Sequence, residues 1–194
     1  EMKVAKPKNE SFDLNSKPKP KSADGKKNAK NSVPRNAAIG KKVTASSEES
    51  NKGNLAKHAV DGDPTTRWCA ANSAPGSWLQ VDLGQAQDIQ NVRLIWEKAN
   101  GAYQYRIEGS ADAKDWKLLV DQSKNKEVRQ VTPHKVNAKN TRYFKITYLG
   151  AKPAYWGSFW EFEAHTGALP ELPRKVIKAS QKSTNPPPKT NEPR

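Results

Sequence analysis

The chain has 194 residues, of which 34% are hydrophobic, and carries a formal net charge of +14 with a mean hydropathy of −0.97. This composition excludes a transmembrane segment, because no run approaches the roughly 18 apolar residues that span a bilayer, and it excludes one packed globule over the whole length. The single cysteine, Cys69, excludes an internal disulfide and leaves the redox compartment open.

Residues 1–35 are predicted to form a disordered basic arm. They carry ten Lys and Arg residues against four Asp and Glu, repeat Lys-Pro-Lys, and contain Phe12 as their only aromatic side chain. Such a segment has too little apolar surface to bury a core. The chain starts at Glu1 without a charged and apolar leader, so we expect it to be processed or excised from a longer protein.

Residues 36–167 are predicted to form the folded domain, because they hold 14 of the 15 aromatic residues. Six runs of strand length alternate apolar and polar residues, which is typical of half-buried strands. These runs are 78–83, 89–96, 103–108, 116–120, 142–148 and 159–163. Gly84, Gly101, Asp112, Lys139-Asn140 and Gly150 are expected to separate them.

Two weaker strand candidates are residues 42–46 and 130–134, the second at a sheet edge because Pro133 cannot donate to a ladder. No segment of ten or more residues has helical periodicity. The pattern therefore predicts an all-β fold, an antiparallel sandwich or jelly roll of about eight strands. Four tryptophans are assigned to its core: Trp68, Trp78, Trp96 and Trp116.

Residues 168–194 are predicted to be an extended, solvated tail with six of the fourteen prolines and a net charge of +4. The two arms hold ten of the fourteen net charges, which leaves +4 for residues 36–167. We therefore expect no nucleic-acid partner, since the basic residues do not form a stripe with aromatics on a folded face. The arms are either linkers to other domains or weak contacts to anionic polymers.

The loop from His58 to Trp68 is the most informative local motif. Gly62 lets the backbone turn tightly between Asp61 and Asp63, and Pro64 fixes the exit, so two carboxylates can converge beside a threonine hydroxyl. Oxygen ligands of this kind suit a hard cation such as calcium. The same residues also favour an ordinary surface turn through hydrogen bonds from side chain to backbone. The local stretch leaves both interpretations open.

Five motifs occur in sequence order: residues 36–48, 59–68, 78–84, 105–110 with Trp116, and 156–161. Together they resemble the discoidin, or coagulation factor 5/8 type C, domain, and most closely its branch in carbohydrate-binding module family 32. The resemblance covers about Asn36 to Gly167. It implies a non-catalytic, galactose-binding-like jelly roll of eight strands that is secreted, extracellular or periplasmic, and joined to an enzyme acting on polysaccharides.

The resemblance also implies a structural Ca²⁺ held by residues from both ends of the domain. The implied ligands are the His58 carbonyl, Asp61, Asp63, Thr66, the Trp160 carbonyl and Glu161. Such a cage would tie the loop to the last strand and contribute stability more than chemistry. Arg67 is expected to be a structural hydrogen-bonding partner near this loop.

Sugar contacts are expected on loops at one end of the sandwich. The resemblance places them at Glu48, Cys69, Glu97, Lys98, Asn100, Tyr155 and Trp156. An indole such as that of Trp156 can stack on the C–H face of a pyranose, with Tyr155 beside it. Cys69 stands where many relatives have histidine and Glu97 where arginine is common, so the identity of the sugar does not carry over.

Enzyme activity is not expected, because the chain has three histidines, one cysteine and no nucleophile and base at a usable spacing. Glu48 and Glu49 are adjacent and would point to opposite faces of a strand. The sequence therefore predicts a calcium-stabilised module that attaches a larger secreted protein to glycans or polysaccharide. The alternative is a cell-surface adhesion domain for an anionic polymer, either acidic polysaccharide or phospholipid.

Overall fold

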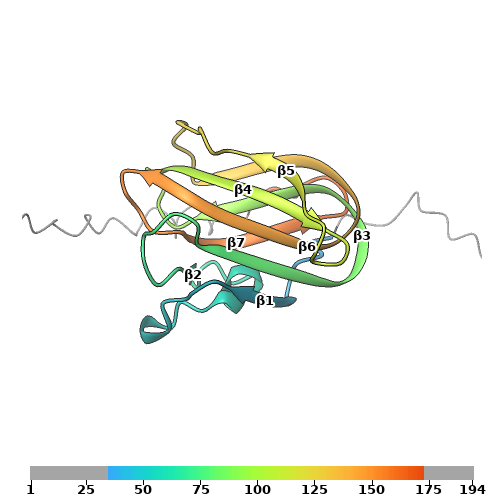
Figure 1. The fold of residues 1–194 in the computed structure, drawn as a ribbon, viewed down its shortest axis with the longest axis horizontal. Helices are drawn as coiled ribbons and strands as arrows, with labels where there is room; N and C mark the ends of the chain where they lie inside the picture. The colour runs from blue at the N-terminus through green and yellow to red at the C-terminus, as the bar shows by residue number, and fades with distance from the viewer. Residues whose placement is uncertain (1–34, 173–194) are drawn as a thin grey trace, which may run out of the picture. The chain divides into compact units, whose positions relative to one another are not determined.

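Alternation of apolar and polar residues gives this domain seven strands and two short 3-10 helices (Figure 1). The computed structural model describes residues 35–172. The elements are β1 (Lys42–Ala45), η1 (Ser50–Lys52), η2 (Ala56–Val60), β2 (Trp68–Cys69), β3 (Trp78–Trp96), β4 (Ala102–Ser110), β5 (Lys117–Asp121), β6 (Val131–Lys152) and β7 (Ser158–His165). The all-β class is confirmed, with seven strands where eight were predicted.

Two pairs of predicted strands are each one long strand, which changes the count. Residues 78–83 and 89–96 both belong to β3, and residues 130–134 and 142–148 fall almost entirely within β6. Gly84 has a φ of 84°, and Asn140 has a φ of 48°. These left-handed residues bend the backbone where the ladder changes register, so hydrogen bonding resumes after the bend instead of ending there.

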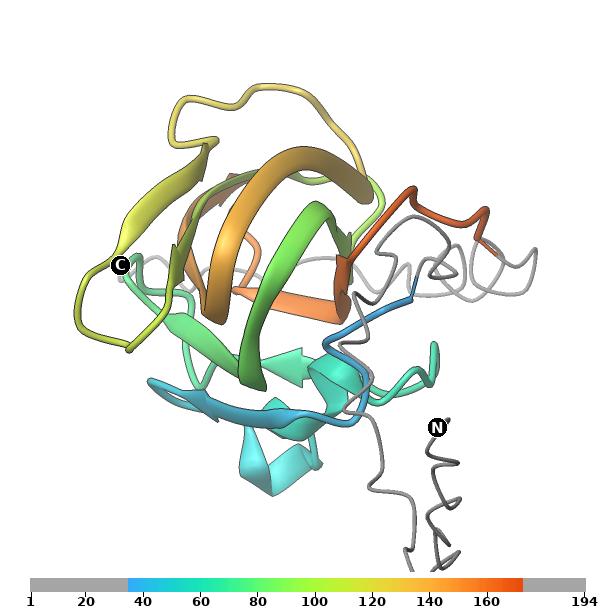
Figure 2. The ribbon, with the colours of Figure 1, turned by 90° about the vertical axis from the view of Figure 1, so that its right-hand side faces the viewer.

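The two long strands connect the two layers of the sandwich. Residues 78–82 of β3 pair with 143–147 of β6, and after the bend residues 91–95 pair with 131–135. One layer contains β1, β4, β5 and the first of these pairings, and the other contains β2, β7 and the second. Both long strands curve in Figure 2. All pairings are antiparallel, and Pro133 lies on the edge as predicted, since β4 pairs only with residues 143–152 of β6.

The core fills the space between the layers and is rich in aromatic rings. Trp96 stacks on Tyr103 with ring centroids 4.1 Å apart, and Trp68 meets Phe159 edge-on at 5.1 Å. Such ring pairs add about 0.5–1.5 kcal/mol each to the burial of their apolar area. The assignment of Trp68 and Trp96 to the core is confirmed.

The assignment of Trp78 and Trp116 to the core is wrong. Both are half-buried on the outer side of the first layer, where the Nζ atom of Lys145 lies 5.7 Å and 4.5 Å from their ring centroids. The reason for Trp78 is strand alternation, because its neighbour Leu79 takes the inward position. Trp116 directly precedes β5 and faces the same lysine.

The predicted arms, residues 1–35 and 168–194, fall almost wholly outside the described residues. Within residues 35–172, the segment after β7 runs along the second layer, where Asn91 Nδ2 donates to the Gly167 carbonyl and Arg93 to the Pro170 carbonyl. In the same part of the chain, no helix has the length and apolar character needed to cross a membrane.

Candidate functional site

The loop after η2 is a tight turn with a left-handed glycine at its centre. The amide of Asp63 donates to Asp61 Oδ1 at 2.9 Å, and Gly62 between them has a φ of 78°. A Cβ atom at position 62 would lie 2.8 Å from Ile39 Cδ1. The left-handed backbone conformation therefore favours glycine at the centre of the predicted calcium loop, whereas the contact is with the tip of the exposed Ile39 side chain, which can move aside.

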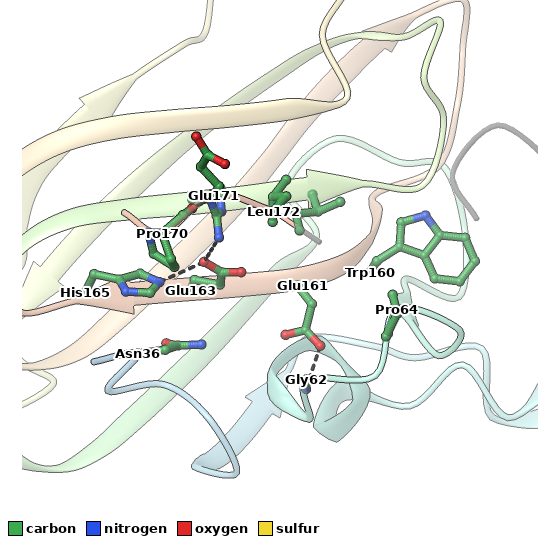
Figure 3. A pocket seen from close by; sticks show the side chains of 12 residues that line it. Asn36, Gly62, Pro64, Trp160, Glu161, Glu163, His165, Pro170, Glu171 and Leu172 are labelled. Atoms are coloured by element: carbon green, nitrogen blue, oxygen red, sulfur yellow. Dashed lines mark hydrogen bonds and ion pairs between the residues drawn. The ribbon is translucent and has the colours of Figure 1, made fainter. Parts of the chain in front are cut away.

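Glu161 belongs to β7, and its side chain contacts this loop. Its Oε1 accepts from the Gly62 amide at 2.7 Å (Figure 3), whereas Oε2 is buried and has no hydrogen-bond partner among residues 35–172. Burial raises the pKa of this carboxyl to about 9, and the nearby Asp61 carboxylate raises it further in the same direction. A buried carboxylate with a free oxygen beside a second carboxylate is costly unless a proton or a cation neutralises it.

Threonine hydroxyls hold the other two carboxylates of the loop. Thr66 Oγ1 donates to Asp61 Oδ2 at 2.8 Å, so these two predicted ligands lie together. Asp63 instead accepts from the amide and hydroxyl of Thr65, which lower its pKa. Within residues 35–172, no three Asp, Glu, His or Cys side chains gather closely enough to hold a metal alone. A cage here therefore needs hydroxyl and backbone oxygens as well, a mixture that calcium accepts.

The backbone carbonyls proposed as ligands come from two different elements. His58 belongs to η2 and Trp160 to β7, next to Glu161. The guanidinium of Arg67 lies 5.6 Å from the centre of the Trp160 ring. Arg67 thus packs against Trp160, and its ion pair is with Glu97 rather than with a residue of the loop; that it supports the loop by a hydrogen bond stays a prediction.

A cavity of about 370 Å³ adjoins the loop on the outer side of the second layer (Figure 3). Among its lining residues is a buried polar network. In it, Glu163 Oε2 lies 2.6 Å from Arg93 Nη2 and 2.8 Å from His165 Nε2. Arg93 also donates to the Pro170 carbonyl at 2.7 Å. This network fixes the segment after β7 to the sheet, and we assign it a structural role.

The expected sugar-binding residues meet where the loop after β3 approaches the loop before β7. The hydroxyl of Tyr155 donates to Asn100 Oδ1 at 3.0 Å, and its ring lies 6.4 Å from that of Tyr103. Trp156 follows in the same loop and is half-buried. We call residues 97–100, 155 and 156 the rim. The rim thus contains five of the seven expected contacts.

Ion pairs hold the charged side chains at the rim. Glu97 contacts Lys98 Nζ at 3.1 Å and Arg67 Nε at 3.5 Å, and its side chain is mostly buried. The backbone amide of Lys98 also donates a hydrogen bond to the Tyr103 hydroxyl. Because these groups hold each other in place, they can present fixed donors and acceptors to sugar hydroxyls.

The other two expected contacts are not part of the rim. Glu48 Oε2 accepts from the amide of Ala56 at 2.8 Å, at the start of η2. Cys69 lies in β2 with only 3% of its surface exposed, so its side chain has almost no surface to offer a sugar. The expectation that Cys69 lines the binding face therefore does not match its burial.

Sequence reasoning missed a polar cluster beside the rim. Glu49 is buried and binds Lys52 Nζ at 2.7 Å and Asn54 Nδ2 at 2.6 Å. Burial alone would raise the pKa of Glu49, but the hydrogen bonds from Lys52 and Asn54 lower it overall. The signal was the spacing of Glu49 and Lys52, three residues apart and directly followed by Gly53, whose φ of 73° ends the turn.

Cys69 gives a simple test of this packing. Burial raises the pKa of its thiol to about 11, so only about one thiol in a thousand is ionised at pH 8, and the thiolate is the reactive form. We expect an aromatic disulfide reagent to label the native protein at least about 100-fold more slowly than the urea-unfolded protein. Equal rates in the two states would show that β2 does not bury this side chain.

Comparison with known proteins identifies the family. Residues 42–162, which include the loop, the rim and most of the sandwich, match the F5/8 type C domain. The chain belongs to the F5/8 type C domain family. The resemblance stated from the sequence motifs is thereby confirmed, and this F5/8 type C domain has solved relatives that are carbohydrate-binding modules.

Chitosan-binding module 1 of a chitosanase/glucanase from Paenibacillus sp. IK-5 is 31% identical to this F5/8 type C domain, with a TM-score of 0.60 over 67% of the chain and 98% of the module. A family 32 module produced by Clostridium perfringens, solved in complex with GlcNAc-α-1,4-galactose, shares the fold with a TM-score of 0.62. It is 21% identical and covers 70% of this chain and 96% of that one.

A curated relative of this F5/8 type C domain is the polysaccharide lyase 8 family protein HylA of Enterococcus faecalis. The two are 27% identical over 117 residues, which is 57% of this chain and 8% of HylA. The chain thus spans less than a tenth of the length of that relative.

Proposed function

We propose that this protein is a non-catalytic, calcium-stabilised carbohydrate-binding module that attaches a larger secreted protein or enzyme to glycans or polysaccharide. The observation that carries the proposal is the rim, where Tyr155 and Trp156 lie beside Asn100 on loops supported by a rigid sandwich. Amphipathic rings next to fixed polar groups suit a pyranose, whose C–H face stacks and whose hydroxyls hydrogen-bond. The similarity to a chitosan-binding module and to a module holding a disaccharide supports the same proposal.

The ligand class follows from the charge balance of the rim. Glu97 is compensated by Arg67 and Lys98, and Glu49 by Lys52. Each of these carboxylates is thus paired with at least one cation, and we propose that the rim binds sugar mainly through stacking and hydrogen bonds. Binding should change little between 50 mM and 500 mM salt, because screening acts mainly on exposed, unbalanced charges.

The proposed calcium belongs to the loop around Asp61 and Glu161. The Oε2 atom of Glu161, which lacks a partner among the described residues, and the contact between Asp61 and Thr66 suit a hard cation that favours oxygen ligands. When bound, the ion would neutralise the buried carboxylates and strengthen the link between the loop and β7. We propose a structural role for it, in a protein that works outside the cell where calcium is abundant.

Attachment to a phospholipid surface is a weaker alternative. The large exposed apolar residues among those described are Ile39, Leu118 and Val128, and they lie in three separate segments. None of them is part of the rim, so the rim lacks the apolar tips that insert into a bilayer. Attachment to an acidic polysaccharide involves a different surface, which is considered below.

A glycan array followed by calorimetry with the full chain tests the proposed function. We expect binding to a set of oligosaccharides with dissociation constants in the range of about 1 μM to 1 mM, equivalent to roughly 4–8 kcal/mol, and no turnover of the bound sugars. If no glycan on a broad array bound in the presence of calcium, the proposal would have to be given up.

A further inference from the structure

The outer face of the first layer carries a second group of sugar-compatible residues, away from the rim loops. Across the sheet, Thr44 on β1 pairs with Gln80 on β3, which pairs with Lys145 on β6. In the next row that points outward, Lys42 pairs with Asp82, which pairs with Tyr143. Two rows of polar side chains thus lie side by side on regular strands.

These rows enclose a depression of about 290 Å³. It is lined by Lys42, Thr44, Gln80, Asp82, Ala113 and Tyr143. The lining combines one aromatic wall with an ammonium, a hydroxyl, an amide and a carboxylate, which together supply both donors and acceptors. Because the residues stand on paired strands, their spacing is fixed before any ligand arrives.

Two tryptophans extend this depression along the sheet. Lys145 Nζ lies 4.5 Å from the Trp116 ring centroid and 5.7 Å from that of Trp78. Both indoles are half-buried, so part of each remains available to a ligand. Aromatic and basic groups are therefore interleaved on a folded face, which the charge distribution along the sequence did not reveal.

The charges on this face favour an anionic ligand. Asp82 is bound by Arg142 through two contacts of 2.7 Å and 2.9 Å, which lower the pKa of Asp82 and compensate its charge. Within residues 35–172, no carboxylate lies within 4.0 Å of the ammonium of Lys42 or Lys145. This holds even though Glu108 is the cross-strand neighbour of Lys145. Two unpaired ammonium groups thus flank the aromatic wall.

We propose that this outer face is a second binding site, specific for an acidic polysaccharide whose pyranose rings carry carboxylates. The carboxylates pair with Lys42 and Lys145, sugar hydroxyls bond to Thr44 and Gln80, and ring C–H faces pack on Tyr143, Trp78 and Trp116. The site differs from the rim in its dependence on charge. One module with two sites can hold a single polymer at two points, which raises avidity without new contacts.

The test measures binding of the full chain to polygalacturonate, with a neutral β-glucan of similar length as the comparison polymer. We expect the Lys42→Gln, Lys145→Gln double variant to bind polygalacturonate roughly tenfold more weakly, as two exposed charge pairs allow. The Trp116→Ala variant should lose about threefold or more. The effect of the lysine variant should shrink as salt rises from 50 mM to 500 mM.

A matched control separates this site from the general basic charge of the chain. The Lys126→Gln, Lys135→Gln variant removes the same charge at exposed positions elsewhere on the domain, and we expect less than a twofold change. An equal loss in this control, or full binding by the Trp116→Ala variant, would overturn the proposal. Thermal melts of each variant confirm folding.

A rim variant, Tyr155→Ala with Trp156→Ala, should keep binding to polygalacturonate through this face. The experiment therefore distinguishes an error in the proposed rim function from an error in the proposed second site.

Discussion

Addition of calcium to the chelator-treated protein is expected to raise its melting temperature by about 10 °C. At 100 times the dissociation constant, a ligand that binds only the folded state adds about 2.7 kcal/mol. For a domain of this size, each kcal/mol shifts Tm by roughly 3–4 °C. The physical reason is the unpartnered Oε2 of Glu161, which lies buried near Asp61 and gains a cation as its partner. Calorimetric scans with EDTA and with calcium measure the shift.

The Glu161→Gln variant shows whether that carboxylate is responsible. In EDTA we expect a Tm close to that of the parent protein, because a carboxyl whose pKa is raised to about 9 is already protonated near neutral pH, and the Gln amide oxygen can accept from the Gly62 amide in the same way. Calcium should no longer raise the Tm of this variant. Glu127→Gln, an exposed change at a surface ion pair with Arg129, is the matched control and should keep the full increase. A Glu161→Gln protein that still gained about 10 °C would place the ion elsewhere.

Replacing Tyr155 and Trp156 together by alanine is expected to weaken glycan binding at least about 30-fold. Aromatic anchors at the centre of a contact commonly carry 2 kcal/mol or more of binding energy, and a factor of ten corresponds to about 1.4 kcal/mol. Tyr155 also orients Asn100 through their 3.0 Å hydrogen bond, so its loss removes a positioned polar group as well as a ring. Calorimetry with the tightest oligosaccharide from the array measures the change.

The sheet-face variant Tyr143→Ala with Trp116→Ala is the control for this experiment. It removes two aromatic rings from half-buried positions outside the rim and should bind a neutral oligosaccharide as the parent does. Circular dichroism verifies that both double variants retain the sheet. If the rim variant bound normally, the sugar would have to contact other loops of the sandwich.

Much of this fold could be predicted from local patterning. The alternating runs from Trp78 to Phe162 mark strands correctly because one side of each strand is buried and the other is not. What the patterning could not show is that Gly84 and Asn140 bend a strand without ending it. That outcome depends on whether the backbone finds its partner again after the bend, which is a property of the assembled sheet.

The same limit explains the two misplaced tryptophans. Hydrophobicity favours burial of any indole, but Trp78 and Trp116 gain partial cover from Lys145, which comes from a strand about 30 to 70 residues later in the chain. For the candidate site, the family resemblance supplied Asp61, Glu161 and Trp156 by position. It could not show the contact between Gly62 and Glu161, 99 residues apart.

An NMR titration with a neutral oligosaccharide that binds on the array is the most direct measurement. Amide signals of residues 97–100 and 155–156 should shift most, while those of Lys42, Gln80 and Lys145 on the outer sheet face stay in place. Shifts confined to the sheet face, or spread evenly over the domain, would contradict a sugar-binding rim.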